Sequence, residues 1–216
     1  MKANRKEILI FDTGSGAKFI ASRLRVLLPN VDFKIITDPE NAPYGNRADS
    51  EILSLIVDKL DAKLKQFSMC VIACNTATVN VIEDLRTLYP GNVFFGIEPM
   101  IKTASAISET RKVIILATEA TKKSSRYKHL VDRYGHDLNI LSPDTSGWAS
   151  EIDANTEVDL TETKELAKLN DCDVVILGCS HYLAIENELK EELPGVAILE
   201  PSRALADVIK GYLHTQ

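Results

Sequence analysis

The sequence predicts an α/β fold of two similar domains, each built on a mainly parallel sheet flanked by helices. Two observations support this prediction. Short apolar runs of strand length alternate with helical segments of ten or more residues, which is typical of parallel sheets covered on both faces. The chain also repeats itself: strands end at Cys74 and Cys179 and at Thr13 and Thr118, and 179 − 74 and 118 − 13 both equal 105. This shared offset indicates a duplicated unit of about 105 residues.

Repeated dipeptides support the duplication. A Pro-Gly and then a Glu-Pro dipeptide follow each of the two cysteines in the same order, beginning at Pro90, Glu98, Pro194 and Glu200. Any two strand-helix units share an apolar pattern, so the apolar runs alone leave coincidence open. Dipeptides that recur in order make coincidence the weaker explanation.

In the first unit, β-branched and aromatic residues cluster between turn residues and predict strands at residues 7–11, 33–37, 70–73 and 93–97. Helices are expected at residues 17–28, 48–67 and 76–88. The longest of these has apolar residues at helical spacing, which predicts one buried face: Ile52, Leu55, Ile56, Leu60 and Leu64. A segment rich in turn residues, 38–45, precedes it.

In the second unit, the same pattern predicts strands at residues 113–117, 138–141, 174–177 and 196–199. Helices are expected at residues 100–107, 121–134, 148–153, 160–169, 182–193 and 203–213, with Gly135 as a stop for the second of them. We expect the first domain to comprise residues 1–97 plus about 203–216, and the second to comprise residues 98–202.

The composition is that of an ordinary soluble protein, with 216 residues, 45% hydrophobic and 26% charged. The net charge of −6 and the lack of a basic run argue against a nucleic-acid partner. No apolar run reaches the length of a membrane span, and the run from Ile8 stops at Asp12, which is too short for a secretory signal. We therefore expect a cytoplasmic protein with reduced cysteines.

The cysteine spacing argues against a metal site. Cys70 and Cys74 are separated by three residues and Cys172 and Cys179 by six, wider than the paired spacing of zinc ligands. Cys70 and Cys172 lie at or before the starts of strands, where a small core residue is the simpler interpretation. No metal and no organic cofactor is expected.

Polar residues gather at the carboxyl ends of the predicted strands, where parallel sheets bind their ligands. They are Asp12, Thr13, Tyr44, Gly45, Cys74, Asn75, Thr76, Thr118, Thr121, Cys179, Ser180 and His181. If the two sheet edges face each other, a small molecule between them has a thiol on each side. A strand-to-helix turn also directs backbone N–H groups and a helix dipole at the ligand, which favours thiolates and carboxylates.

Two opposed thiols suit the inversion of a carbon acid. One thiolate removes the Cα proton while the other thiol delivers a proton to the opposite face. The developing negative charge needs fixed hydrogen-bond donors, for which the side chains of Asn75, Thr76, Thr118, Thr121 and Ser180 are candidates. Asp12 and His181 are placed to help the two thiols exchange protons.

Six motifs together resemble, in order, those of glutamate racemases in the aspartate/glutamate racemase superfamily. They are Phe11-Asp12-Thr13-Gly14-Ser15-Gly16, Pro43-Tyr44-Gly45, Ala73-Cys74-Asn75-Thr76-Ala77, Gly96-Ile97-Glu98-Pro99, Leu116-Ala117-Thr118-Glu119-Ala120-Thr121 and Gly178-Cys179-Ser180-His181-Tyr182. The resemblance covers most of the chain. It implies two α/β domains related by a pseudo-twofold axis, an active site between them, and cofactor-independent interconversion of L- and D-glutamate that supplies D-glutamate for peptidoglycan.

The resemblance also implies residue roles. Cys74 and Cys179 are the expected acid/base residues, and Asp12, His181 and Glu151 are expected to assist them. Substrate contacts are expected at Asp12, Thr13, Tyr44, Gly45, Asn75, Thr76, Thr118, Thr121, Ser180 and His181. Glutamate is the expected small-molecule partner, and a homodimer is compatible with the family.

Several positions depart from the family pattern and keep alternatives open. Thr13 replaces the usual serine, Ser15 and Ala17 alter the glycine-rich turn, Ser180 replaces threonine, and Leu183 replaces proline. A related amino-acid racemase, such as an aspartate racemase, and a non-catalytic clamshell that binds an acidic amino acid are the alternatives. The Asp12-Thr13-Gly14 triplet also matches aspartic proteases, but their chemistry needs two such loops and one copy is present.

Overall fold

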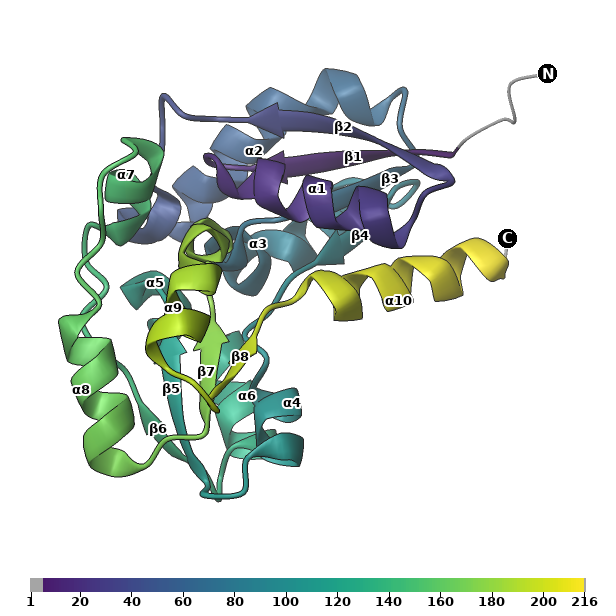
Figure 1. Ribbon diagram of the computed structural model, residues 1–216. Coiled ribbons are helices and arrows are strands. Elements are labelled where there is room, and N and C mark those ends of the chain that lie inside the picture. Colours follow the sequence, from purple (N-terminus) through teal and green to yellow (C-terminus); the bar gives the residue numbers. More distant parts are fainter. Residues whose placement is uncertain (1–5, 216) are drawn as a thin grey trace.

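The computed structural model describes residues 6–215, so the ends of the predicted first domain, residues 1–5 and 216, lie outside the described part. Figure 1 shows two lobes, each built around one sheet. The strand orders are β2-β1-β3-β4 and β6-β5-β7-β8, and all pairings are parallel. The predicted fold class is confirmed, and the exact domain boundaries stay a prediction.

The first lobe contains β1 (Lys6–Asp12), β2 (Val31–Thr37), β3 (Met69–Ile72) and β4 (Val93–Gly96), with α1 (Gly16–Leu27), η1 (Tyr44–Asn46), α2 (Asp49–Leu64) and α3 (Asn75–Leu88). Alternate residues of β1 pack on opposite faces of this sheet. Ile8 and Ile10 lie in a core with α1 and α10 (Ser202–His214), whereas Leu9 and Phe11 lie in a core with α2 and α3. Both faces are therefore buried, as a continuous apolar strand requires.

The second lobe contains β5 (Lys112–Leu116), β6 (Asn139–Leu141), β7 (Val174–Leu177) and β8 (Ala197–Leu199). Its helices are α4 (Ile101–Ile107), α5 (Glu119–Lys123), α6 (Ser125–Tyr134), α7 (Trp148–Asp153), α8 (Thr161–Asn170), η2 (Ser180–Ile185) and α9 (Glu186–Glu192). Ile114 and Leu116 of β5 pack with Trp148 and Tyr182, and Val113 and Ile115 pack on the α4 and α6 side.

Two expected helices are broken in the structure. The segment 121–134 is divided into α5 and α6 because Ser124 has an extended backbone, φ −61° and ψ 148°, and its hydroxyl accepts a hydrogen bond from the Tyr127 amide at 3.1 Å. Such a cap begins a new helix. The segment 182–193 begins instead as the 3-10 helix η2, which starts directly after Cys179, and becomes α-helical only at Glu186.

The duplication predicted from the sequence is visible in the strand register. Leu9 of β1 pairs with Cys70 of β3, and Ile114 of β5 pairs with Val175 of β7. Each residue of the second pair follows its counterpart in the first pair by the same number of positions, since 114 − 9 and 175 − 70 both equal 105. The central strand pairs of the two sheets therefore place Cys74 and Cys179 at equivalent positions.

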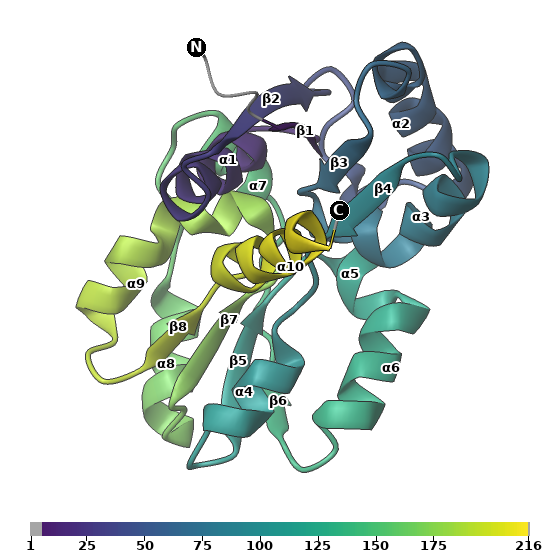
Figure 2. The same cartoon turned by 90° about the vertical axis from the view of Figure 1, so that its right-hand side faces the viewer.

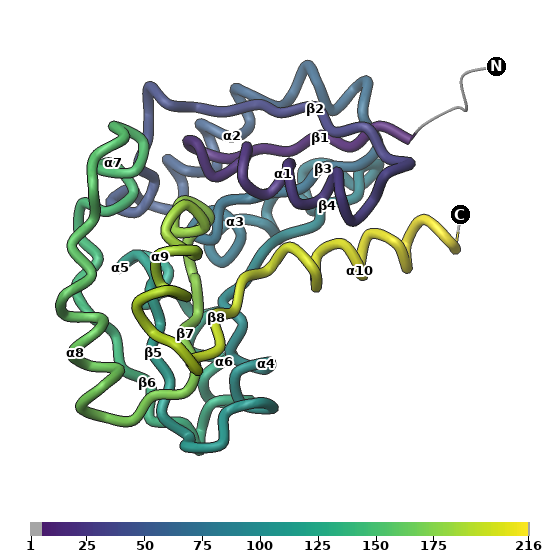
Figure 3. The backbone as a smooth tube through the Cα atoms, viewed as in Figure 1, coloured from purple at the N-terminus to yellow at the C-terminus, as the bar shows by residue number. Residues whose placement is uncertain are grey.

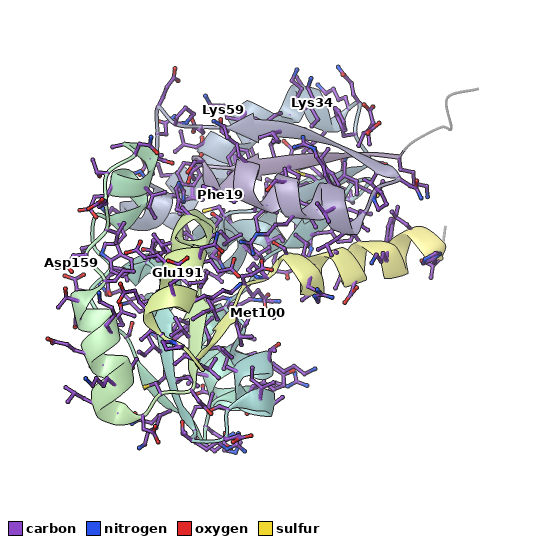
Figure 4. The ribbon with its side chains drawn as sticks, viewed as in Figure 1. Phe19, Lys34, Lys59, Met100, Asp159 and Glu191 are labelled. Atoms are coloured by element: carbon purple, nitrogen blue, oxygen red, sulfur yellow. The ribbon has the colours of Figure 1, made fainter. Side chains whose placement is uncertain are left out.

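The chain passes between the lobes twice, as the tube in Figure 3 shows. The first crossing joins β4 to α4 through Glu98-Pro99, and the second joins β8 to α10 through Glu200-Pro201. Met100, labelled in Figure 4, lines the same cavity as Pro201, so the crossings lie close together. After the second crossing α10 packs on α1 and β4 (Figure 2). None of the helices between residues 6 and 215 is long and apolar enough to cross a membrane.

Candidate active site

The two cysteines occupy the predicted strand-to-helix turns. Cys74 precedes the first residue of α3, and Cys179 precedes the first residue of η2. Both are free thiols with 7% of their surface exposed. The extended backbone at each cysteine ends the strand, and the helix that follows directs its first N–H groups toward the cleft. Each sheet therefore presents a sulfur at its carboxyl end.

Asp12 and Ser180 join the carboxyl ends of the two sheets. The Ser180 hydroxyl donates to Asp12 Oδ2 at 2.8 Å, and the Thr13 amide donates to Asp12 Oδ1 at 2.7 Å. Asp12 is fully buried, and this burial raises its pKa to about 6 although the nearby His181 charge and the two hydrogen bonds oppose the rise. A carboxyl group with such a pKa can exchange protons near neutral pH.

Three threonines join the sheets on the other side of the cleft. Thr76 Oγ1 lies 3.0 Å from Thr118 Oγ1 and 3.4 Å from Thr121 Oγ1, and the Thr118 and Thr121 hydroxyls are 3.0 Å apart. Thr118 also caps α5, because its Oγ1 accepts from the Thr121 amide at 3.3 Å. Three of the five predicted donors, one from the first lobe and two from the second, are thus brought together in one hydroxyl cluster.

A chain of contacts leads from Cys179 back to the first lobe. Cys179 Sγ lies 3.6 Å from His181 Nδ1, and His181 Nε2 lies 3.1 Å from Asp153 Oδ2. The other oxygen of Asp153 accepts from the Ser15 amide at 3.0 Å. Burial alone would lower the pKa of His181, but the hydrogen bonds to Asp153 and Cys179 outweigh it and raise the pKa to about 11. The same contact with His181 overcomes burial and lowers the pKa of Asp153 to about 2.

Asp153 was missed by the sequence analysis, which assigned the assisting acid to Glu151. The two residues lie on the same short helix, α7. The Glu151 carboxylate lies toward Gly147 and contributes to a raised pKa of Tyr182, whereas the carboxylate bonded to His181 is that of Asp153. No local signal distinguishes them, since the contact joins residues 28 positions apart.

Cys74 has a different environment from Cys179. Burial raises its pKa well above the ordinary value, and the charges of Asp12 and Cys179 raise it further, against hydrogen bonds from the Ala77 and Thr76 amides. The charge of one sulfur therefore affects the pKa of the other. At neutral pH these effects keep the proton on Cys74.

The Asn75 amide is the clearest candidate for a substrate contact. Its side chain is 2% exposed, yet neither the oxygen nor the nitrogen of its amide has a hydrogen-bond partner within the described residues. A buried polar group left without a partner costs about 1–3 kcal/mol, and natural proteins rarely leave both amide atoms unpaired. The amide thus has capacity to bind a polar group placed beside Cys74.

The remaining predicted residues, Tyr44 and Gly45, have different surroundings. The Tyr44 hydroxyl donates to Asp38 Oδ2 at 2.9 Å, so it is turned into the first lobe. Gly45 lies against the Thr118 side chain, and both line a cavity of about 110 Å³. A second cavity, of about 160 Å³, is lined by His181 and Asp153. Pro43, Ala149 and Ser150 line both cavities, so the loop before η1 and α7 meet over the cleft.

Two glycines allow the lobes to approach. A Cβ added at Gly14 would overlap the side chains of Asp153 and His181, and one at Gly16 would overlap those of Asp12 and Ser180. These glycines are required for close contact rather than for a left-handed backbone. Among residues 6–215, no group of three or more histidine, cysteine or acidic side chains is arranged to hold a metal ion.

Comparison with known proteins gives a consistent result. The Asp/Glu/Hydantoin racemase family model matches residues 32–209. The glutamate racemase of Clostridium perfringens strain SM101 is 32% identical over 188 residues, covering 84% of this chain and 72% of the relative. The glutamate racemase of Aquifex aeolicus is 30% identical over 214 residues, covering 97% and 84%.

The solved structures agree. Escherichia coli glutamate racemase, in complex with L-glutamate and the activator UDP-MurNAc-Ala, superimposes with a TM-score of 0.86 at 26% identity, covering 97% of this chain and 83% of that one. The glutamate racemase of Aquifex pyrophilus gives a TM-score of 0.74 at 27% identity, covering 95% and 83%.

Proposed function

The chain belongs to the Asp/Glu/Hydantoin racemase family, and we propose that it interconverts L- and D-glutamate without a cofactor, using Cys74 and Cys179 as the two acid/base groups. The resemblance found in the sequence is confirmed at the level of the family. The observation that supports the mechanism best is the pair of free thiols at equivalent strand ends, on either side of a contact between the lobes. Both turns lie where the lobes meet, since the Asp12–Ser180 and Thr76–Thr118 contacts join residues that lie close to the two cysteines in the chain or in the sheet, as two-sided proton transfer requires.

The two thiols have different neighbours. His181, whose pKa is raised to about 11 by its hydrogen bonds, lies with Nδ1 3.6 Å from the sulfur of Cys179 and can exchange a proton with it. Cys74 keeps its proton because burial and the Asp12 charge disfavour a second anion. In one direction the Cys179 thiolate removes the Cα proton while the Cys74 thiol protonates the opposite face. In the reverse direction the Cys74 thiol passes its proton to Asp12, whose pKa is about 6, and Cys179 takes a proton from His181, so that the Cys74 thiolate removes the Cα proton and the Cys179 thiol protonates the opposite face.

The substrate is bound mainly by neutral donors. The Asn75 amide and the hydroxyls of Thr76 and Thr118 are available for the two carboxylates of glutamate. Donors that are fixed before the reaction also stabilise the negative charge that develops on Cα and spreads onto the oxygens of the adjacent carboxylate. The product D-glutamate would serve peptidoglycan synthesis. Since the mechanism needs free thiols, the proposed location is the reducing cytoplasm; a homodimer stays a prediction.

The direct test is to incubate the protein with L-glutamate in deuterated water. Circular dichroism should decay while the Cα–H signal is lost, and Cys74→Ala and Cys179→Ala should each reduce the rate by about 10²–10⁴-fold. Cys70→Ala and Cys172→Ala are matched controls, because these buried thiols lie near the starts of β3 and β7, four and seven residues before the site cysteines. Full activity in either site variant would contradict the two-thiol mechanism. Binding without exchange would favour the clamshell, and faster turnover of L-aspartate would favour the related racemase.

A further inference from the structure

The two Glu-Pro dipeptides repeated in the sequence form the crossings between the lobes, and each glutamate binds an arginine. Glu200, at the second crossing, pairs with Arg23 of α1 at 3.2 Å, and its other oxygen accepts from the Ser202 amide at 2.7 Å. Glu98, at the first crossing, pairs with Arg126 of α6. Each arginine lies on a helix that follows the first strand of its own sheet, so the two pairs occupy similar places in the two lobes although they are not matched by the 105-residue offset.

Each arginine also reaches a second glutamate in the opposite lobe. Arg23 of the first lobe pairs with Glu186 of α9, and Arg126 of the second lobe lies 3.6 Å from Glu83 of α3. A further cation on the same helix supports each of these glutamates: Lys190 lies 2.5 Å from Glu186, and Arg86 lies 2.8 Å from Glu83. We call these sets the Arg23 cluster (Arg23, Glu186, Glu200, Lys190) and the Arg126 cluster (Arg126, Glu83, Glu98, Arg86).

Each cluster joins the lobes near one of the two contacts that close the active site, further along the helices that follow that contact. The Asp12–Ser180 hydrogen bond joins the end of β1 to the start of η2, and the Arg23 cluster ties the helices that follow them, α1 and α9, 11 and six residues further along the chain. The Thr76–Thr118 contact lies between the starts of α3 and α5, and the Arg126 cluster ties α3 to α6 about 12 Å along the helix from Asn75.

The two clusters differ in strength. The Arg23 cluster is the more buried, with side-chain exposures of 30% for Arg23, 8% for Glu186 and 16% for Glu200. The corresponding values are 41% for Arg126, 27% for Glu98 and 66% for Glu83. Exposed ion pairs contribute little because water screens them, so the Arg23 cluster is expected to dominate.

We propose that Arg23 and Arg126 are positioning residues, whose ion clusters hold the two crossings and fix the separation of Cys74 from Cys179. The inference rests on the proposed function. The arginine fork is suited to this task, because one planar group with several donors can bridge two carboxylates. Displacing a reacting group by about 1 Å can cost about 10²-fold in rate, so modest opening at the crossings matters for turnover.

The test compares Arg23→Gln and Arg126→Gln with arginine controls on the same helices. Arg25→Gln is the control on α1, since Arg25 donates to the Phe33 carbonyl within its own lobe, and Arg133→Gln is the control on α6, since Arg133 contacts the Tyr134 ring. Alkylation of the cysteines by iodoacetamide is followed by peptide mass spectrometry with and without saturating glutamate, and KM and kcat are measured for both enantiomers.

In Arg23→Gln, alkylation of Cys74 and Cys179 without glutamate should accelerate about tenfold while that of Cys70 is unchanged, and glutamate should restore protection. The KM should rise about five- to tenfold with a smaller change in kcat, because substrate binding must then close the cleft. Arg126→Gln should show smaller effects, and Arg23→Lys should recover only part of the loss. Glu200→Gln, which keeps the side-chain shape, provides the same comparison if Arg23→Gln fails to fold.

Alkylation rates and KM equal to those of the Arg25→Gln control would overturn the inference, as would a lower melting temperature with neither of these quantities changed. Alkylation does not require turnover. If the wild-type protein fails to exchange the Cα proton of glutamate, the proposed function is refuted, and the alkylation comparison still decides whether the clusters hold the lobes.

Discussion

Replacing Asp153 by Asn tests the chain of contacts behind Cys179. The substitution keeps the shape of the side chain but removes the charge that faces His181 Nε2 at 3.1 Å. A hydrogen bond to a charged partner contributes about 1.5–3 kcal/mol, and one pKa unit corresponds to about 1.4 kcal/mol. The pKa of His181, raised to about 11 in the wild type, should therefore fall by about one to two units. The Asp153 side chain is 31% exposed, and screening by water favours the lower value.

The sign of the effect on activity follows from the protonated imidazole. It is present below its pKa and is lost as the pH rises through that value, so Asp153→Asn should move the alkaline limb of the kcat/KM profile to lower pH by about one unit. The acid limb, which reflects Asp12, should move less and also to lower pH, since the charge of Asp153 contributes weakly to the raised pKa of Asp12. Circular dichroism at several pH values gives the profile, and NMR titration of the imidazole gives the pKa directly.

The matched control for this experiment is Asp159→Asn. Asp159, labelled in Figure 4, is an acid of the same connection whose carboxylate accepts only from the nearby Thr161 amide among the hydrogen bonds described. It should leave the alkaline limb unchanged. If Asp153→Asn also leaves the alkaline limb unchanged, or if His181 of the wild type titrates near the ordinary value of about 6.5, then the proposed link from Asp153 through His181 to Cys179 is wrong.

Three further substitutions have definite expected outcomes. Gly16→Ala should reduce racemisation by about 10²-fold, because its Cβ would push Asp12 and Ser180 apart; unchanged kinetics would show that the lobes need not approach so closely. Asp12→Asn should raise the free energy of unfolding above pH 6 by up to about 3 kcal/mol. Because the pKa of Asp12 is raised by folding, ionising this carboxyl destabilises the folded state increasingly as the pH rises from 3.8 to about 6, and the asparagine removes this effect. Racemisation should fall at the same time; urea unfolding measures the stability and circular dichroism measures the activity. Asn75→Leu should stabilise the ligand-free protein by about 1–3 kcal/mol and remove the rise in melting temperature caused by glutamate; a lower stability without ligand would show that the amide is satisfied in solution.

The features that the sequence predicted are local. Strand and helix patterns, the cysteines at strand ends and the 105-residue offset depend on runs of neighbouring residues, and the register of β1 on β3 and of β5 on β7 confirms the offset. The division of residues 121–134 into α5 and α6 was missed because helical spacing continues through Ser124, and a serine interrupts a helix only when its hydroxyl is used as a cap.

The features that the sequence did not predict are contacts between distant segments. The assisting acid was assigned to Glu151 from a loose family match, whereas His181 is bonded by Asp153. Arg23 and Glu186 are 163 positions apart, and nothing in the surrounding residues of either predicts the other. Surface arginines and glutamates are common on any helix, so their pairing becomes visible only when the two lobes are placed together.

The duplicated scaffold carries two unequal thiols, and the proposed reaction depends on this difference. If both sulfurs had a cation beside them, two thiolates would face the substrate and no proton donor would be available. If both had a buried carboxylate nearby, two thiols would face it and no base would be available. His181 lies beside Cys179, while the charge of Asp12 acts on Cys74, so each sulfur has its own partner for proton exchange. The 105-residue repeat therefore supplies opposed positions for the sulfurs, and the residues that break the repeat supply a different partner to each.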